Sequence, residues 1–287
     1  MACKGIYDRV LHSHAQIKAI SYIDITDLLN IQNMYLRNAL IVIFAGHASA
    51  KVAFAGVNLA GCEIGMQTNV INQGGQSGGK LAETWSLLAK RYANRPKVVF
   101  GIMNEPHGSD QSDADFDINN WAGVLQQSVN AIRQAGAVDQ WIFLLGRNYA
   151  NAGAFPGTSA DALKAIKNPG VGNENLIFEV HQYFDETGGK STVCNQPNTS
   201  TFKSLGNYLR SVGRKAFIGE IGGGNGKDCI DLICPAVETI GQYSDVFLGW
   251  TSWAAGNWWP DYELLESPKD GQDAPIISSC FASKFTD

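Results

Sequence analysis

Residues 98–107 read VVFGIMNEPH, an apolar run that breaks off at Asn104, Glu105 and Pro106. A short apolar run of this kind is typical of a strand buried on both faces, as in a parallel sheet covered by helices. Glu105 therefore falls at the end of the predicted strand. Because Pro106 restricts the residue before it, we expect Glu105 to be extended and held in a defined direction. An isolated Asn-Glu-Pro tripeptide would also fit a loop carboxylate that faces water.

The composition is that of a globular chain. It has 287 residues, 45% of them hydrophobic, and a formal net charge of −5. A chain of this length can bury one large core. Its charges are scattered and form no basic run, which argues against a nucleic-acid partner.

The first fifty residues contain an apolar run, 39–45 (ALIVIFA), that is too short to span a bilayer. Arg37 precedes it and Ala48-Ser49-Ala50 follows, so residues 34–50 resemble a secretory signal peptide with cleavage after Ala50. Residues 1–33 would then be an upstream extension of doubtful status. The mature protein is expected to be secreted and to have no membrane anchor. The alternative is that residues 39–45 form a buried strand of the domain.

Four cysteines lie among polar and Gly-rich loops of the C-terminal half: Cys194, Cys229, Cys234 and Cys280. Disulfides between them would fit an exported protein, although spacing alone does not pair them. A zinc site fits less well, because the chain has no C-x-x-C and no nearby pair of histidines. Cys3 and Cys62 are predicted to be unpaired.

From residue 51 onward, strand-like runs alternate with amphipathic helical stretches, the pattern of parallel strands joined by crossover helices. No linker or repeat interrupts it, so residues 51–287 are predicted to form a single domain. The predicted strands cover 54–59, the run from 98, 141–145, 176–180, 216–220 and 246–253. The predicted helices cover 81–92, 118–135, 160–166, 202–212 and 230–243, and the predicted loops 72–79 and 222–226.

A second predicted strand also ends in an acid, since residues 216–220 read AFIGE. Glycoside hydrolysis needs two carboxyl groups, one that protonates the leaving oxygen and one that attacks the sugar or activates water. In a parallel barrel the carboxyl ends of all strands open on one face. Glu105 and Glu220 can therefore converge on one bond, although they are far apart in the sequence.

Seven motifs occur in a fixed order along the chain: FAGVNLAG (54–61), NQGGQ (72–76), FGIMNEPH (100–107), AGAF (152–155), LIFEVHQY (176–183), GEIGGGN (219–225) and GWTSWAAG (249–256). Together they resemble glycoside hydrolase family 5, and specifically its fungal endo-β-1,4-glucanases, over about residues 51–280. The resemblance implies a (β/α)8 TIM barrel and a secreted endo-β-1,4-glucanase that retains the anomeric configuration. It implies a β-glucan polysaccharide as substrate and no metal or organic cofactor, and we expect a monomer.

The resemblance also implies a role for each matching residue. Glu105 matches the general acid/base, and Glu220 the nucleophile that forms a glycosyl-enzyme intermediate. Asn104 matches the residue that binds the sugar 2-hydroxyl. His181 and Tyr183 match the pair that orients and tunes the nucleophile.

Trp253 matches the aromatic platform under the sugar ring, and an indole face suits a pyranose. Trp250, Trp258 and Trp259 are candidates for further subsites. The family's disulfide pattern would pair Cys194 with Cys229 and Cys234 with Cys280.

The chain departs from the family between Gly61 and Asn72, where two βα units with Arg-Leu-Pro and His-Asn motifs are expected. About six of the eight strands are recognisable, so the barrel is predicted to be incomplete. Residues 1–50 could fill the gap, which their sequence does not suggest; otherwise the product folds poorly or the gene model lacks an exon. The alternatives to an active endoglucanase are a catalytically impaired glucan-binding relative, a truncated gene product, and a β-mannanase.

Overall fold

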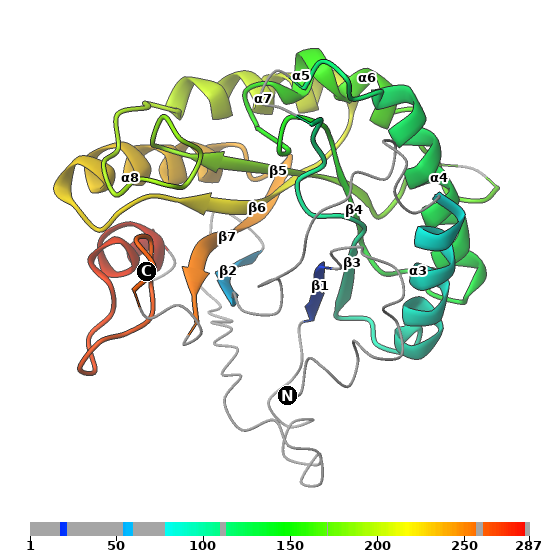
Figure 1. The fold of residues 1–287 in the computed structure, drawn as a ribbon, viewed down its shortest axis with the longest axis horizontal. Coiled ribbons are helices and arrows are strands. Elements are labelled where there is room, and N and C mark those ends of the chain that lie inside the picture. The colour runs from blue at the N-terminus through cyan, green and yellow to red at the C-terminus, as the bar shows by residue number, and fades with distance from the viewer. Residues whose placement is uncertain are drawn as a thin grey trace, which may run out of the picture. The chain divides into compact units, whose positions relative to one another are not determined.

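The computed structural model describes residues 18–21, 54–59, 78–109, 113–170, 172–256 and 261–284. Figure 1 shows its elements, which in chain order are β1 (Lys18–Ser21), β2 (Phe54–Leu59), α3 (Gly78–Tyr92), β3 (Val98–Gly101), α4 (Ile118–Gln134), β4 (Ile142–Leu145), α5 (Phe155–Thr158), α6 (Ala160–Leu163), β5 (Leu176–Tyr183), α7 (Thr199–Val212), β6 (Ala216–Gly222), α8 (Lys227–Gln242), β7 (Phe247–Ala255), the π-helix η2 (Ile277–Phe281) and the 3₁₀-helix η3 (Ala282–Lys284).

The described residues fall into two compact units. The first unit consists of 18–21, 78–109, 113–150, 157–170 and 172–177, and the second of 54–59, 151–156, 178–256 and 261–284.

In the first unit β3 and β4 pair in parallel, with Phe100 beside Ile142. Every residue of both strands is buried, as expected for strands covered on both faces. β1 pairs with β3 in the antiparallel direction, with Lys18 opposite Gly101. Part of the segment that the sequence assigns to an upstream extension therefore contributes a strand, which its sequence did not suggest.

Helices α3 and α4 pack against each other in the first unit, side by side in Figure 1. The indole Nε1 of Trp85 on α3 donates to the Ile102 carbonyl at 3.0 Å, and that of Trp121 on α4 donates to the Leu145 carbonyl at 2.9 Å. Each buried indole thus satisfies its one polar atom on a carbonyl at the end of a strand. Trp121 is 2% exposed and belongs to the core.

The start of α3 differs from the prediction, because the helix begins at Gly78, inside the predicted loop 72–79. A Cβ on Gly78 would lie 2.9 Å from Cγ2 of Val124 on α4, so the close approach of the two helices uses a residue without a side chain. Tertiary packing here outweighs the low helix propensity of glycine. The four-residue helix α5 was not predicted either, since it is too short to show a periodic pattern.

In the second unit β5, β6 and β7 pair in parallel, and β2 pairs in parallel with β7. Helices α7 and α8 pack together beside these strands (Figure 1). The six strands predicted from the sequence are all present as β2 to β7. β5 continues through Tyr183, so His181 and Tyr183 belong to the strand itself and not to the loop after it.

Two disulfides close loops in the second unit, Cys194–Cys229 and Cys234–Cys280. Both pairs implied by the family resemblance are confirmed. The second bridge joins α8 to η2 and so fastens the C-terminal segment to the helix layer.

Several sequence features lie outside the described residues: the predicted signal peptide 34–50, the short connection 61–72, and Cys3, Cys62, Trp258 and Trp259. Among the residues that are described, no helix is long and apolar enough to cross a membrane.

Candidate active site

The predicted nucleophile lies at the centre of a buried polar cluster in the second unit. The register of β5 and β6 places His181 beside Glu220. The Tyr183 hydroxyl donates to Glu220 Oε2 at 2.7 Å, and His181 Nδ1 lies 3.4 Å from the same oxygen. Only 3% of Glu220 and 2% of His181 is exposed. The hydrogen bond from Tyr183 orients the carboxylate and favours its ionised form.

Glycines allow this cluster to form. A Cβ on Gly189, where φ is 90°, would lie 2.7 Å from the Tyr183 ring. A Cβ on Gly222, at the end of β6, would lie 2.7 Å from the Trp253 carbonyl oxygen. The sequence therefore leaves room for the loop after β5 and the end of β7 to pack against the residues that surround Glu220.

Trp253, near the end of β7, is half-buried, and its indole is held by a tyrosine that the sequence did not reveal. Its Nε1 donates to the Tyr262 hydroxyl at 2.9 Å, and that hydroxyl lies 3.4 Å from the Gly189 carbonyl, to which it donates. Burial raises the pKa of Tyr262 to about 12, so this phenol stays neutral across the physiological range. The peptide bond between Trp253 and Ala254 is cis.

A second group missed from the sequence is Glu266, which is fully enclosed beside β7. Ser252 Oγ donates to its Oε2 at 2.6 Å, and its backbone N–H donates to the Ala254 carbonyl at 2.9 Å. Burial raises the pKa of Glu266 to about 8, because the ionised form loses its hydration. Glu266 thus fastens the C-terminal segment on both sides of Trp253.

Trp250, a candidate for a further subsite, belongs to the core instead. It is 3% exposed, and its ring centroid lies 4.8 Å from that of Phe281. A ring enclosed in this way has no free face on which a sugar could stack.

In the first unit Asn104 and Glu105 follow directly after β3 and the short run that extends it. The expectation of an extended Glu105 is wrong, since its φ is 45°, in the left-handed region. The chain turns sharply here, and the Pro106 carbonyl accepts the N–H of Tyr149 at 3.3 Å. Such a conformation costs about 1–3 kcal/mol in a residue other than glycine and is often found at functional sites. Asn104 Oδ1 is buried and has no hydrogen-bond partner among the described residues.

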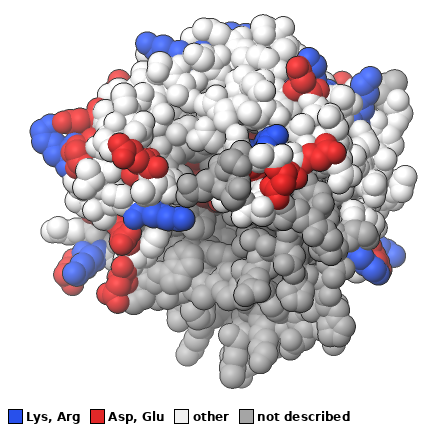
Figure 2. All heavy atoms as spheres, turned by 45° about the horizontal axis from the view of Figure 1, so that its top comes forward, with Lys and Arg blue, Asp and Glu red and all other residues white. Residues whose placement is uncertain are grey.

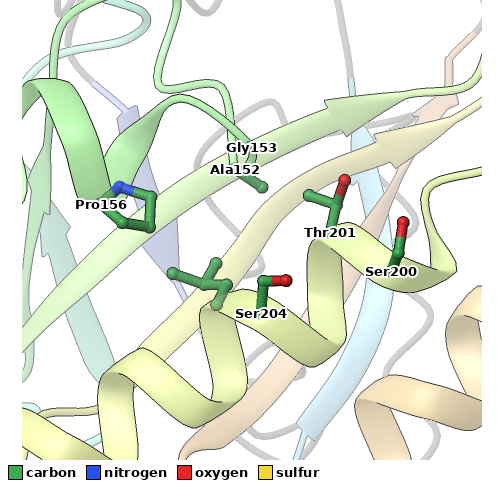
Figure 3. Close-up of a pocket in the computed structure, with 7 residues that line it drawn as sticks. Ala152, Gly153, Pro156, Ser200, Thr201 and Ser204 are labelled. Carbon is green, nitrogen blue, oxygen red and sulfur yellow. The ribbon is translucent and has the colours of Figure 1, made fainter.

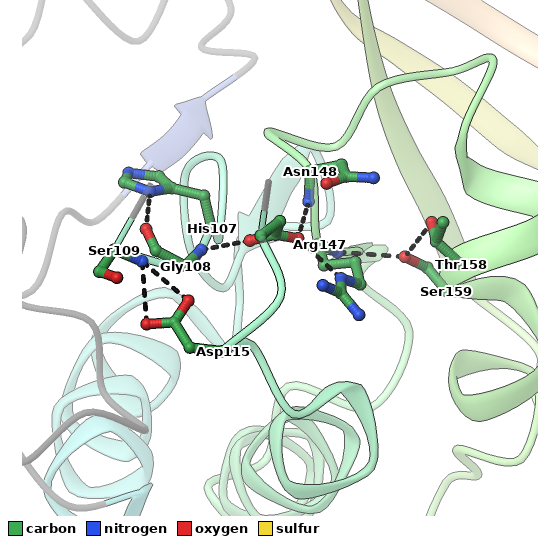
Figure 4. A network of polar contacts seen from close by, with 9 residues as sticks. His107, Gly108, Ser109, Asp115, Arg147, Asn148, Thr158 and Ser159 are labelled. Carbon is green, nitrogen blue, oxygen red and sulfur yellow. Dashed lines mark hydrogen bonds and ion pairs between the residues drawn. The ribbon is translucent and has the colours of Figure 1, made fainter. Parts of the chain in front are cut away.

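The loop after Glu105 is fixed by Asp113, a buried aspartate that the sequence did not reveal. Asp113 accepts hydrogen bonds from the Gly108 N–H, from the Asn148 N–H at 2.9 Å and from Arg147 Nε at 2.7 Å. Figure 4 shows Gly108, Arg147 and Asn148 converging from the two loops. Because the donors come from the segments after β3 and after β4, one carboxylate links both.

A stacked pair of rings lies on the same two loops. The ring centroids of His107 and Tyr149 are 4.2 Å apart and their planes differ by 15°. Asn148, Tyr149 and Ala150 all have φ between 55° and 56°, a left-handed turn that presents the 41% exposed Tyr149 side chain. The same Asp113 carboxylate that anchors Asn148 therefore also supports this pair.

The cavity of about 190 Å³ in the second unit is of another kind (Figure 3). Ser200, Thr201 and Ser204 of α7 line one side, facing the segment from Ala152 to Pro156. Its lining carries hydroxyls and apolar groups but no titratable side chain, so we assign it no chemical step.

On the face of the molecule drawn in Figure 2, acidic and basic side chains are interspersed over the described residues.

Comparisons with known proteins agree with this geometry. The model of the family described as "Cellulase (glycosyl hydrolase family 5)" matches residues 23–256. The chain belongs to glycosyl hydrolase family 5. It is 40% identical over 222 residues to endoglucanase EG-II of Hypocrea jecorina, an alignment that covers 75% of this chain and 51% of that protein.

Solved structures of the family share the fold. Cel5A (EG2) from Hypocrea jecorina superposes with a TM-score of 0.67 at 40% identity, covering 73% of this chain and 64% of that one. XacCel5A, solved in complex with cellopentaose, gives a TM-score of 0.65 at 34% identity and covers 73% of this chain and 66% of that one. Parallel strands alternating with helices therefore form an incomplete (β/α)8 barrel, as predicted. The chain spans about half the length of the curated Hypocrea relative.

The predicted family 5 site residues are thus placed as follows. Glu220, His181 and Tyr183 contact one another in the second unit, where Trp253 also lies. Asn104 and Glu105 lie in the first unit, at the carboxyl end of β3. His181, Tyr183, Glu220 and Trp253 lie within the last residues of β5, β6 and β7.

Proposed function

We propose that the chain is a retaining endo-β-1,4-glucanase that cleaves internal bonds of cellulose or a related β-glucan. The observation that carries this proposal is the buried Glu220 carboxylate, which accepts a 2.7 Å hydrogen bond from Tyr183 and lies beside His181 in a family 5 chain. The names of its relatives support it, since they are endoglucanases, and XacCel5A binds cellopentaose.

In this mechanism Glu220 attacks the anomeric carbon and forms a covalent glycosyl-enzyme, while the carboxylic acid of Glu105 gives its proton to the departing glycosidic oxygen. Glu105, now a carboxylate, then takes a proton from water, whose oxygen displaces Glu220 from the anomeric carbon. Two inversions give net retention. Asn104 would bind the sugar 2-hydroxyl, a contact that strengthens in the transition state.

The remaining residues prepare Glu220 and the sugar. The Tyr183 hydroxyl stabilises the ionised carboxylate that must act as nucleophile. Trp253 offers an apolar ring to a pyranose, and its bond to Tyr262 fixes the orientation of the indole.

We further propose that the protein acts outside the cell. The disulfides Cys194–Cys229 and Cys234–Cys280 are typical of oxidising compartments. A soluble or fibrous glucan is also too large to enter a cell, so an enzyme for it has to be exported.

The test is release of reducing ends from carboxymethyl-cellulose by the full chain, beside Glu220→Gln and Glu105→Gln. Glu238→Gln, an exposed glutamate on α8, is the matched control for loss of one negative charge. We expect activity in the wild type and the control, and a loss of about 10³-fold or more in Glu220→Gln, since little turnover remains without the nucleophile. NMR of the first product should show the β-anomer. A first α-anomer would refute retention, and faster turnover of mannan would favour the β-mannanase.

A second candidate is a glucan-binding relative with little activity, because the chain spans only 51% of the Hypocrea endoglucanase. Cooperative unfolding and cellulose binding without release of reducing ends would favour it over the enzyme.

A further inference from the structure

A third glutamate belongs to the buried cluster around Glu220. Glu179 Oε1 on β5 lies 3.5 Å from His181 Nε2, while His181 Nδ1 lies 3.4 Å from Glu220 Oε2. The exposed fractions are 0% for Glu179, 2% for His181 and 3% for Glu220. The imidazole therefore lies between two carboxyl groups, one at each ring nitrogen, inside the second unit.

Hydrogen-bond chemistry limits the protonation of such an arrangement. An ionised carboxylate only accepts hydrogen bonds, and a neutral imidazole has one N–H donor and one bare nitrogen. With a proton on Nε2 alone, the lone pair of Nδ1 would face the Glu220 carboxylate. While both carboxyl groups are ionised, both contacts are favourable only when each ring nitrogen carries a proton. Burial by itself opposes the second proton, because it disfavours charge.

The fold accommodates the Glu179 carboxyl through a glycine at position 219, although burying this carboxyl does not stabilise the protein. A Cβ on Gly219, the residue before Glu220, would collide with Glu179 Oε1. Glu179 Oε2 is buried and has no hydrogen-bond partner among the described residues. A carboxyl buried with an unsatisfied oxygen destabilises a fold, which points to a role in the site.

We propose that Glu179 is a positioning residue for the glycosidase reaction, which holds His181 with a proton on both ring nitrogens so that Nδ1–H faces the nucleophile Glu220. This inference rests on the proposed function for the role of Glu220 and goes beyond it in assigning Glu179. Glu179 touches neither substrate nor the reacting atoms in this scheme. It acts through His181.

Two tyrosines of the second unit also interact with Glu220, namely Tyr183 and Tyr262. Tyr183 donates to Glu220, and Tyr262 bonds Trp253. Burial raises the pKa of Tyr262 to about 12, so it does not titrate with the imidazole.

The first test follows the His181 imidazole by NMR in the full chain, with its signal identified by its loss in His181→Gln. In Glu179→Gln the pH at which the imidazole titrates should fall by about one unit or more, because one of two close negative charges is gone. In Glu238→Gln it should not change. An unchanged titration in folded Glu179→Gln overturns the proposal.

The second test moves the carboxyl without removing its charge. Gly219→Ala should push Glu179 away from His181 and lower the same titration, and adding Glu179→Asp, which is shorter by one methylene, should restore it at least in part. Failure of the double variant to restore the titration overturns the proposal, even where Glu179→Gln does not fold.

The activity test separates this proposal from the proposed function. In Glu179→Gln kcat on carboxymethyl-cellulose should fall about tenfold with KM unchanged, because Nδ1–H of His181 no longer faces the nucleophile. If the imidazole titration shifts in Glu179→Gln but the wild type hydrolyses no glucan, the contact between Glu179 and His181 is supported and the proposed function is refuted. Wild-type hydrolysis with an unchanged kcat in Glu179→Gln refutes the role of Glu179 alone.

Discussion

Replacement of Glu266 by glutamine should make the protein more stable at pH 8 and change its stability little at pH 4.5. Glutamine has the shape of the neutral acid and can still accept the hydrogen bond that Ser252 Oγ gives to Glu266 Oε2. What it removes is the ability to ionise. The substitution therefore isolates the effect of one buried titrating group.

The magnitude follows from the pKa of Glu266, which burial raises from 4.5 to about 8. Between these values the unfolded chain has released the proton and the native protein keeps it, so the free energy of unfolding falls as the pH rises. The contribution of Glu266 is fully present below pH 4.5 and is lost as the pH passes 8. A shift from 4.5 to about 8 corresponds to roughly 5 kcal/mol at 1.36 kcal/mol per unit.

The assay is urea unfolding followed by tryptophan fluorescence at several pH values from 4.5 to 8.5, with both disulfides intact. The wild type and the exposed-site control Glu238→Gln should lose stability in parallel. Glu266→Gln should lose less, so that the difference grows towards several kcal/mol at pH 8. All other groups titrate alike in the three proteins and cancel. Equal pH slopes for the wild type and Glu266→Gln would refute the reasoning.

Three further predictions concern the site and its support. Tyr183→Phe removes a hydrogen bond to a charged carboxylate, about 1.5–3 kcal/mol, and should lower kcat on carboxymethyl-cellulose about 10- to 100-fold in protein that a melting curve shows to be folded at the assay temperature. Asp113→Asn breaks the pair with the largely buried Arg147 and should cost about 3 kcal/mol in urea unfolding; a cost near zero would contradict its role. Joint replacement of Cys234 and Cys280 by serine opens a loop with a sequence separation of 46 and should cost about 4 kcal/mol, measured by the same unfolding, whereas wild-type stability would contradict it.

The features predicted correctly from the sequence are those with a local pattern. The strand before Glu220 and the strand that carries His181 are apolar runs interrupted by polar residues at their ends. The resemblance also implied the cysteine pairs, which are confirmed, and the chemical roles of the site residues, which stay predictions. Periodicity and motifs depend only on residues that are close in the sequence, and such local patterns were sufficient to predict these strands.

The supporting residues could not be predicted in this way. Asp113 and Arg147 are joined through loops that have no periodicity, and Tyr262 and Glu266 reach β7 from a segment without regular structure. Glu179 did give a signal. It is the one acid in the apolar run 176–180, two residues before His181, and alternate residues of a strand share a face.

The left-handed Glu105 shows a different limit. The restriction that Pro106 places on its neighbour favours an extended residue, and it was outweighed by the turn that brings the Pro106 carbonyl to the N–H of Tyr149. The preference of a residue before proline for an extended conformation is overcome here, because the buried Asp113 carboxylate fixes the two loops of the first unit.

The pairing of β1 and the predicted cleavage after Ala50 exclude each other in one molecule. β1 lies opposite all of β3, from Lys18 beside Gly101 to Ser21 beside Val98. Removal of residues 1–50 would expose the backbone N–H and C=O groups of that edge of β3, and an open edge of a buried strand favours association between chains.

The mass of the protein recovered from a secreting host decides between cleavage after Ala50 and a retained β1. An intact N-terminus means that β1 covers β3 in the mature protein, and a chain that begins at Lys51 means that β3 must find another partner. In the second case we expect self-association that rises with concentration, and a monomer of residues 51–287 with unchanged stability would refute any structural role for β1.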